Sequence, residues 1–382
     1  MNLTDVDDKT IRNSQKEKKS LKEFTAVYEK SFLNGLEELN IEKPEVMPKA
    51  TEHIKEMVKI VKTLLKKGFA YKAEDGIYFS IDKFKNYGKL SRINLEELKV
   101  GASKRVLSDE YDKENVNDFV LWKFYSPEDG NVFWETEIGK GRPGWHIECS
   151  AMSSKYLGNS FDIHTGGVDL IFPHHENEIA QSEAANNEKF VNYWMHNGWL
   201  LVDNKKMSKS LGNFYNLKDI KDKGYELVHL SYFFLTKSYR QNFNFTWKNL
   251  EASKVAYKKL KKKISELKDD KKTNKKYLKE FKNAIEDDLN TPRALEVLWK
   301  FVNDDDAEGK IKTIEKIDEV LGLDLLKKEE LKVPTEIKKL VSERENCRRK
   351  KDWVCADKIR DNLKDKGWVV EDVGEGSVVT KL

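Results

Sequence analysis

The sequence predicts a multidomain α/β protein with a mixed α/β region to about residue 225, an α-helical bundle to about residue 330 and a small C-terminal α/β tail. At 382 residues the chain exceeds the usual size of one domain and can form two or three cores. Aromatic, histidine and glycine residues concentrate between residues 118 and 202. Beyond about residue 225, long Lys/Glu/Leu segments with few glycines are typical of a helical bundle.

Residues 50 to 68 are the first segment with a clear helical pattern. Apolar side chains recur there at three- and four-residue intervals, at Ile54, Met57, Val58, Val61, Leu64 and Leu65. This spacing predicts an amphipathic helix, and Gly68 supplies a left-handed stop at its C-terminal end. Residues 76 to 105 have short apolar patches broken by Gly88 and Gly101, which predicts mostly loop and short strand.

Two patterns predict the helices of the bundle. One apolar stripe on a helix is formed by Val255, Leu260, Ile264 and Leu267. Another helix is expected to start at Thr291 and Pro292, since a side-chain cap there precedes a residue whose φ is already fixed.

The C-terminal tail is predicted to hold one helix and one hairpin. The helix is expected over residues 338 to 366, ended by Gly367. Two apolar stretches, residues 368–370 and 378–380, flank the Gly-Glu-Gly turn at 374–376 and predict a terminal hairpin.

Composition excludes several classes of protein. Charged residues make up 36% of the chain and the mean hydropathy is −0.73, while the longest apolar runs, residues 119–122 and 199–202, are too short to span a bilayer. Residues 1–10 contain no apolar signal-peptide core. We therefore expect a cytoplasmic protein with no membrane partner. Three cysteines, of which Cys347 and Cys355 lie in the C-terminal third, exclude a disulfide framework.

Positive charge is concentrated in one segment although the net charge is only +4. Residues 251 to 285 carry 13 Lys and 5 Asp or Glu. Such a segment could contact nucleic-acid phosphates, because neutralising them releases counterions. An ordinary solvated helix face accounts for the same charge run, so both interpretations stay open at this point.

A Cys, His and Glu set predicts a metal site. Pro173 should open a helix, in which His174 and Glu178, four residues apart, share one face. Cys149 lies 25 residues before His174 and could add a thiolate; zinc accepts S, N and O ligands together. The alternative is a core cysteine beside hydrogen-bonded histidines. Against that alternative, four of the seven histidines fall within thirty residues, at His146, His164, His174 and His175.

A second candidate site is the run Lys206, Met207, Ser208, Lys209 and Ser210, followed by Leu211, Gly212 and Asn213. Two lysines and two hydroxyls on a short loop can hold a polyphosphate, with Lys209 acting as a point charge on oxygens where negative charge develops. An ordinary surface turn has the same composition, so the run is weak evidence by itself.

Taken together, these segments resemble one family. Residues 144–152, 161–164, 169–181 and 206–210 resemble the catalytic core of cysteinyl-tRNA synthetases, in order and at that family's spacing. Residues 2–9, 87–92, 118–123, 287–292 and 351–372 also resemble segments of the family. The resemblance covers essentially the whole chain.

The resemblance implies a class I synthetase with three parts. Residues 1–225 would form a Rossmann-like catalytic domain with an insertion at about 20–117. Residues 226–330 would form a helical stem-contact and anticodon-binding domain of the DALR-like type, and residues 331–382 a C-terminal anticodon-recognition subdomain. The implied activity is that of a cysteine–tRNA ligase, in which cysteine and ATP give cysteinyl-adenylate before transfer to the terminal ribose of tRNA(Cys), with release of AMP and diphosphate.

The resemblance also assigns residues to roles. Cys149, His174 and Glu178 would be three of four ligands of one Zn2+ that binds the substrate thiolate. Zinc prefers soft thiolate to a hydroxyl, so cysteine is separated from serine without an editing domain. The cysteine pocket would be bordered by Thr4, Trp145 and His164. The ATP-binding loop would be Lys206, Met207, Ser208, Lys209 and Ser210, with Lys206 and Lys209 catalytic and Mg2+ bound with ATP. The implied partners are tRNA(Cys), ATP and L-cysteine, and the implied state is a monomer.

The sequence departs from the family pattern at its start. The family has a first βα unit before the segment at residues 2–9, carrying the fourth zinc ligand, a Cys, and a His-Ile-Gly-His tetrad that holds ATP. Three explanations are open: a longer cellular protein, a split enzyme with a separate N-terminal fragment, or a non-catalytic tRNA-binding relative. Thr165 stands where glycine is commoner in the family. We expect little cysteine-dependent ATP–pyrophosphate exchange from this chain alone. A related ligase that joins cysteine to an amino-sugar is a rival assignment.

Overall fold

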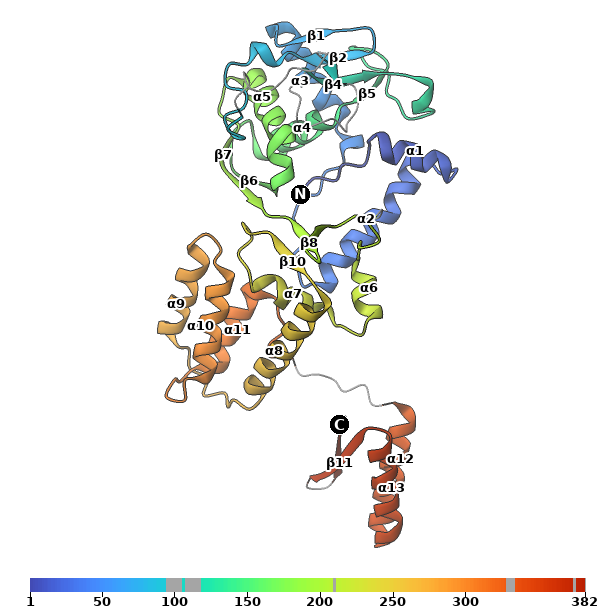
Figure 1. Ribbon diagram of the computed structural model, residues 1–382, viewed down its shortest axis with the longest axis vertical. Helices are drawn as coiled ribbons and strands as arrows, with labels where there is room; N and C mark the ends of the chain where they lie inside the picture. The colour runs from blue at the N-terminus through green and yellow to red at the C-terminus, as the bar shows by residue number, and fades with distance from the viewer. Residues whose placement is uncertain (94–104, 107–117, 209–210, 328–333, 374–375, 382) are drawn as a thin grey trace. The chain divides into compact units, whose positions relative to one another are not determined.

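The computed structural model describes residues 1–93, 105–106, 118–208, 211–327, 334–373 and 376–381 (Figure 1). The chain divides into two compact units, Met1–Leu325 and Leu326–Leu382, which are described separately. None of the helices within these ranges is long and apolar enough to cross a membrane. The domain boundaries expected at about residues 225 and 330 remain predictions.

A five-stranded sheet forms one layer of the first unit. Its strands are β1 (Ala70–Lys72), β2 (Gly76–Phe79), β4 (Asp118–Phe124), β3 (Arg105–Val106) and β5 (Gly141–Pro143). All neighbours pair antiparallel except β3 and β4, which are parallel. The central strand β4 is apolar at consecutive positions, and Phe119, Val120, Leu121 and Trp122 are all buried. Such a continuous apolar run is the pattern of a strand covered on both faces.

Helices α3 (Ile54–Lys67), α4 (Trp145–Leu157) and α5 (Glu176–Asn186) contact one another beside this sheet (Figure 1). Helix α3 follows the short turn η1 (Ala50–Glu52) and ends at Gly68, whose φ is 80°. Met57, Val61 and Leu64 are fully buried in the shared core. The amphipathic helix and its glycine stop are confirmed.

The N-terminal residues run beside the sheet-bearing core and lead into two capped helices. Leu3 makes a parallel bridge to Lys49, and α1 (Asp8–Lys16) follows. Asp7 caps α1: its carboxylate accepts a hydrogen bond from the Thr10 amide, and Thr10 Oγ1 accepts one from the Asp7 amide. Helix α2 (Leu21–Glu38) has an equivalent box at its start. Reciprocal caps of this kind fix where a helix begins.

Strands β6 (Phe161–Gly167) and β7 (Val191–Asn197) pair in parallel and are connected through α5. Between β6 and α5, residues Val168–Leu170 (η4) and Ile171–His175 (η5) form irregular turns. The helix expected to open at Pro173 is therefore regular only from Glu176, and the Phe172–Pro173 peptide bond is cis.

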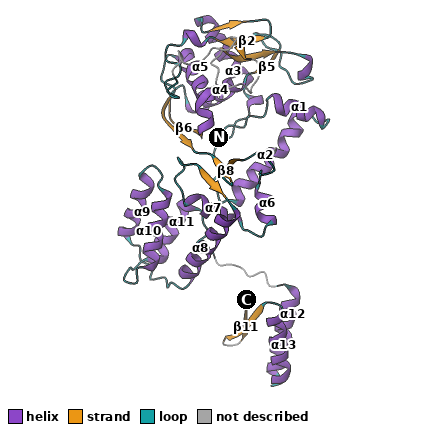
Figure 2. Cartoon of the chain, in the orientation of Figure 1, coloured by secondary structure: helices purple, strands orange, loops and turns teal. Residues whose placement is uncertain are grey.

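A second small sheet contains β8 (Leu200–Val202) between β10 (Phe243–Phe245), which is parallel to it, and β9 (Lys205–Lys206), which is antiparallel. Helices α6 (Leu217–Asp222) and α7 (Leu227–Leu235) share its hydrophobic core. The helical bundle follows, with α8 (Trp247–Ser265), α9 (Lys275–Glu286), α10 (Thr291–Asn303) and α11 (Lys310–Leu321) (Figure 2).

Two details predicted for the bundle are wrong. In α8, Leu260 and Ile264 are buried, but Val255 is 60% exposed, because the buried face contains Tyr257 instead. Helix α10 begins at Thr291 as expected, yet its cap is Asn290, whose side-chain oxygen accepts a hydrogen bond from the Arg293 amide.

The C-terminal unit consists of α12 (Thr335–Arg349), α13 (Trp353–Asp365) and a hairpin of β11 (Trp368–Val373) and β12 (Gly376–Lys381). The single helix predicted over residues 338–366 is wrong, because the chain turns between α12 and α13 at a left-handed Lys351. The hairpin is confirmed. Cys347 and Cys355 form a disulfide across this turn, so two of the three cysteines are paired, although one disulfide is not a framework.

Candidate functional site

The predicted metal ligands converge from two segments of the first unit, helix α4 and the turn that leads directly into α5. Helix α4 carries Cys149, the turn before α5 carries His174, and the first turns of α5 carry Glu178. One ligand atom from each lies within 4.8 Å of the other two, and all three residues are buried. A second group of the same kind, His164, His175 and Glu178, shares the glutamate. His174 and Glu178 are four residues apart, whereas Cys149 lies 25 residues before His174, so the fold brings the thiol to the other two ligands.

Glu178 is the centre of this arrangement. Its side chain is completely buried, and within the described part of the chain neither carboxylate oxygen has a hydrogen-bond partner. The Nε2 atoms of His164 and His174 lie 3.4 and 3.5 Å from Oε2, and that of His175 lies 3.8 Å away. A buried carboxylate without hydrogen bonds is costly. A bound cation would remove this cost.

The surrounding histidines are neutral. Burial is the largest cause of a lowered pKa in all four histidines of this cluster. The pKa is about 3 for His146, about 4 for His164 and about 2 for His175, and that of His174 lies well below its ordinary value. Protonated histidines therefore do not balance a charge on Glu178. Neutral imidazole is the form that binds metals.

In the protein alone, burial disfavours the charged forms of Cys149 and Glu178. Burial raises the pKa of the Cys149 thiol, and the nearby Glu178 raises it further, while a hydrogen bond with the Asn2 side chain opposes them. Burial also raises the pKa of Glu178. A divalent cation reverses this preference, since a coordinated thiol is deprotonated. A soft sulfur, an imidazole nitrogen and a carboxylate oxygen form a donor set that zinc accepts.

Two hydrogen bonds between ring nitrogens orient the histidines. His146 Nδ1 and His174 Nδ1 are 2.9 Å apart, which leaves Nε2 of His174 directed toward Glu178. His175 Nδ1 and His196 Nε2 are 2.8 Å apart. Ligating histidines commonly bond through the second nitrogen, which fixes the tautomer and ring orientation. His196 in β7 was not predicted from the sequence, because nothing in its local pattern distinguishes it.

The residues expected to border cysteine lie on two sides of this cluster. Thr4 and Trp145 line one cavity of about 1060 Å³, together with residues of α1, β4 and β5. The Trp145 ring stacks obliquely on His174, with centroids 4.4 Å apart. His164 lies in β6, with its ring 4.9 Å from that of His175. Trp145 therefore contacts both the cavity and one of the predicted metal ligands.

The predicted ATP loop begins in a different sheet. Lys206 is the last residue of β9, is exposed, and its Nζ lies 5.6 Å from the centroid of the Trp199 ring. The Ser208 amide donates to Asn213 Oδ1 at 2.9 Å, and Asn213 Nδ2 donates to the Lys206 carbonyl at 3.1 Å. Asn213 thus closes the base of the loop. Lys209 and Ser210 lie outside the described residues.

Comparisons with known proteins agree with this site. The model of the class I (C) tRNA synthetase catalytic domain matches residues 1–255, and that of the cysteinyl-tRNA ligase anticodon binding domain matches residues 332–377. The chain is 45% identical to a cysteine–tRNA ligase of Brachyspira hyodysenteriae, over 98% of the chain and 85% of that relative. It is 43% identical to one of Protochlamydia amoebophila, over 100% of the chain and 84% of that relative.

A solved structure supports the fold independently of close sequence similarity. The Mycobacterium tuberculosis methionyl-tRNA synthetase bound by methionyl-adenylate superposes with a TM-score of 0.54 at 11% identity, covering 85% of this chain and 76% of that one. The predicted fold class, an α/β class I synthetase fold with a C-terminal anticodon-binding part, is confirmed. The family resemblance seen in the sequence is likewise confirmed: the chain belongs to the cysteine–tRNA ligases, a family of class I aminoacyl-tRNA synthetases.

Proposed function

We propose that this protein ligates L-cysteine to tRNA(Cys). Cysteine and ATP form cysteinyl-adenylate and diphosphate, and the cysteinyl group then passes to the terminal ribose of the tRNA with release of AMP. The observation that carries the proposal is the buried group of Cys149, His174 and Glu178 in a chain related along its length to cysteine–tRNA ligases.

Within this proposal, Cys149, His174 and Glu178 hold one Zn2+. They are three of its four expected protein ligands, and zinc can expand its coordination to take the substrate thiolate as an added ligand. Zinc supplies a soft acceptor for the thiolate of cysteine, and serine offers only a hard, neutral hydroxyl. The environment of Glu178 supports this role, because its buried carboxylate has no hydrogen-bond partner among the described residues.

The remaining residues of the reaction centre have separate roles in the proposal. Thr4 and Trp145 line the cavity next to the metal ligands, and with His164 they border the bound cysteine. Lys206 and Lys209 act on ATP, which binds with Mg2+ along the loop from Lys206 through Met207 and Ser208 to Ser210. Their charge stabilises the negative oxygens of an in-line displacement, so no general base is required.

The tRNA contacts are proposed to involve two surfaces. Lys258, Lys259 and Lys262 are exposed on α8 and can meet phosphates of the stem. The C-terminal unit would read the anticodon, since residues 332–377 match an anticodon binding domain. That match favours a tRNA ligase over a ligase acting on an amino-sugar. We further propose that the protein works as a monomer in the cytoplasm.

Metal analysis with a matched control tests the proposal. Cys149→Ala is expected to purify with less zinc than the wild type, because it removes the sulfur donor from the group of Cys149, His174 and Glu178. Cys347→Ala removes a cysteine of the C-terminal unit and should leave the zinc content unchanged. Equal zinc in the wild type and Cys149→Ala would contradict the assignment.

A further inference from the structure

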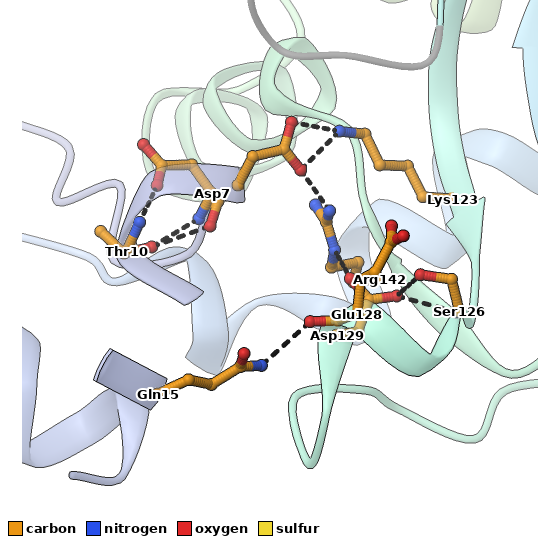
Figure 3. A network of polar contacts seen from close by, with 9 residues as sticks. Asp7, Thr10, Gln15, Lys123, Ser126, Glu128, Asp129 and Arg142 are labelled. Atoms are coloured by element: carbon orange, nitrogen blue, oxygen red, sulfur yellow. Dashed lines mark hydrogen bonds and ion pairs between the residues drawn. The ribbon is translucent and has the colours of Figure 1, made fainter. Parts of the chain in front are cut away.

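A network of four charged side chains connects α1 to the strands that precede α4 (Figure 3). Asp8, in the first turn of α1, accepts hydrogen bonds from Lys123 Nζ at 3.0 and 3.1 Å and from the Arg142 guanidinium. Arg142 Nε also donates to Asp129 Oδ1 at 2.7 Å. Arg142 therefore joins two carboxylates that are 121 residues apart in the chain.

Burial makes this network sensitive to the loss of one member. Lys123, Arg142 and Asp129 are almost fully buried, whereas Asp8 is half-buried. Lys123 in β4 and Arg142 in β5 are cross-strand partners, so two cations lie side by side in the sheet. Like charges opposite one another weaken a strand pair. Asp8 is the carboxylate that both cations share, and it holds them together.

The network lies directly beside the proposed cysteine pocket. Asp8 is four residues after Thr4, and Arg142 is three residues before Trp145. Asp8, Lys123, Arg142 and both pocket residues line the same cavity.

Two glycines, one on each side of Arg142 and Pro143, allow the chain that leads into α4 to lie close against β4. A Cβ atom at Gly141 would lie 2.0 Å from the Lys123 carbonyl oxygen, and one at Gly144 would lie 2.2 Å from the Val120 carbonyl oxygen. At these two glycines the backbone of β5 and of Gly144, the N-cap residue of α4, lies directly against β4. A shift of Arg142 is therefore passed to Trp145.

We propose that Asp8, Lys123 and Arg142 are positioning residues that fix the distance between Thr4 and Trp145 and so set the affinity for cysteine. This inference rests on the proposed function, because it assumes that these two residues border bound cysteine. Asp8, Lys123 and Arg142 line the same cavity as Thr4 and Trp145, and their proposed role is to hold these two residues in place. Cys149 lies one turn after Trp145 in α4, and the His174 ring stacks on Trp145, so the test measures zinc content as well as cysteine affinity.

The test measures cysteine binding and zinc content separately. The zinc-loaded chain is titrated with L-cysteine in a calorimeter, as wild type, Asp8→Asn, Asp8→Asn/Lys123→Met and the control Asp82→Asn, which changes an exposed aspartate of η2 (Ile81–Lys83). We expect Asp8→Asn to weaken cysteine binding roughly tenfold, about 1.4 kcal/mol, at unchanged zinc content. Lys123→Met removes one cation and should restore much of the affinity. Asp82→Asn should match the wild type.

The outcomes separate a positioning role of the network from a purely structural role and from failure of the proposed function. Unchanged cysteine affinity in Asp8→Asn overturns the inference. Equal loss of zinc and cysteine binding, without recovery in the double variant, also overturns it, since that pattern indicates a purely structural role. If Asp8→Asn does not fold, Arg142→Lys replaces it, because Lys retains the charge but cannot bridge Asp8 and Asp129 in the same way. A wild type that binds zinc but not cysteine refutes the proposed function instead.

Discussion

Replacing Glu178 by Gln separates metal binding from folding. In the protein without a cation, burial raises the pKa of Glu178 and favours its neutral form. Gln has nearly the same shape and is also neutral, so we expect the metal-free variant to be about as stable as the metal-free wild type. The variant loses the only carboxylate of the predicted ligand set, so zinc should no longer stabilise it.

The size of the effect follows from linkage. Zinc at a hundred times its Kd stabilises the folded wild type by about 2.7 kcal/mol. At about 2.1 cal/mol/K of unfolding entropy per residue, a unit the size of Met1–Leu325 shifts its Tm by roughly 1.5 °C per kcal/mol, so zinc should raise the Tm of the wild type by about 4 °C. Calorimetric scans with zinc and with chelator measure this difference. Glu188→Gln, an exposed change in the loop after α5, should behave as the wild type.

Two results would refute the reasoning about Glu178. If zinc raises the Tm of Glu178→Gln as much as that of the wild type, the carboxylate is not a ligand. One hydrogen bond is expected to contribute about 1 kcal/mol to stability. If the metal-free variant is less stable than the metal-free wild type by more than this amount, the carboxylate has a structural role in the protein without metal.

Three further predictions concern other parts of the chain. Changing Lys258, Lys259 and Lys262 to Gln should weaken tRNA binding. The plot of log binding constant against log salt concentration should become less steep, by about 0.7–0.9 for each phosphate that these lysines neutralise in the wild type. An unchanged slope in filter-binding assays would place the tRNA surface elsewhere. Reducing the disulfide between α12 and α13 should destabilise the C-terminal unit by about 2.5 kcal/mol, because the closed loop no longer restricts the entropy of the unfolded chain. Equal hydrogen-exchange protection in the oxidised and the reduced protein would contradict this prediction. Asn213→Ala removes both bonds at the base of the predicted ATP loop and should weaken ATP binding in calorimetry without changing zinc content; unaltered ATP affinity would deny the loop that role.

Local patterns predicted some elements well. The apolar spacing and the final glycine of α3 are short-range features, and Gly68 adopts the left-handed conformation that ends the helix. The terminal hairpin was predictable for the same reason, since its two apolar strands flank a glycine turn. The break between α12 and α13 was not, because it falls in a charged stretch without Gly or Pro. There Lys351 takes a left-handed φ and Asp352 caps the next helix through the Cys355 amide.

The candidate site was predictable only in part. The spacing of His174 and Glu178 indicated two donors on one face, Cys149 was a possible thiolate 25 residues before His174, and the family resemblance assigned all three to one zinc site. The neighbour His196 comes from a parallel strand, and its pairing with His175 depends on the register of β7 beside β6. The network around Arg142 was missed for a similar reason. Its partners lie far apart in the sequence, and only the packing of α1 against the sheet brings Asp8 to it.

The central claim is that Cys149, His174 and Glu178 hold a metal that binds the thiolate of substrate cysteine. The most direct test replaces zinc with cobalt(II) and records the near-ultraviolet thiolate-to-cobalt absorption during titration with L-cysteine and, separately, with L-serine. We predict that the absorption rises to saturation with cysteine and does not change with serine, because only the thiolate is a soft ligand. No change with cysteine in a cobalt-loaded chain, or an equal change with both amino acids, would contradict the claim.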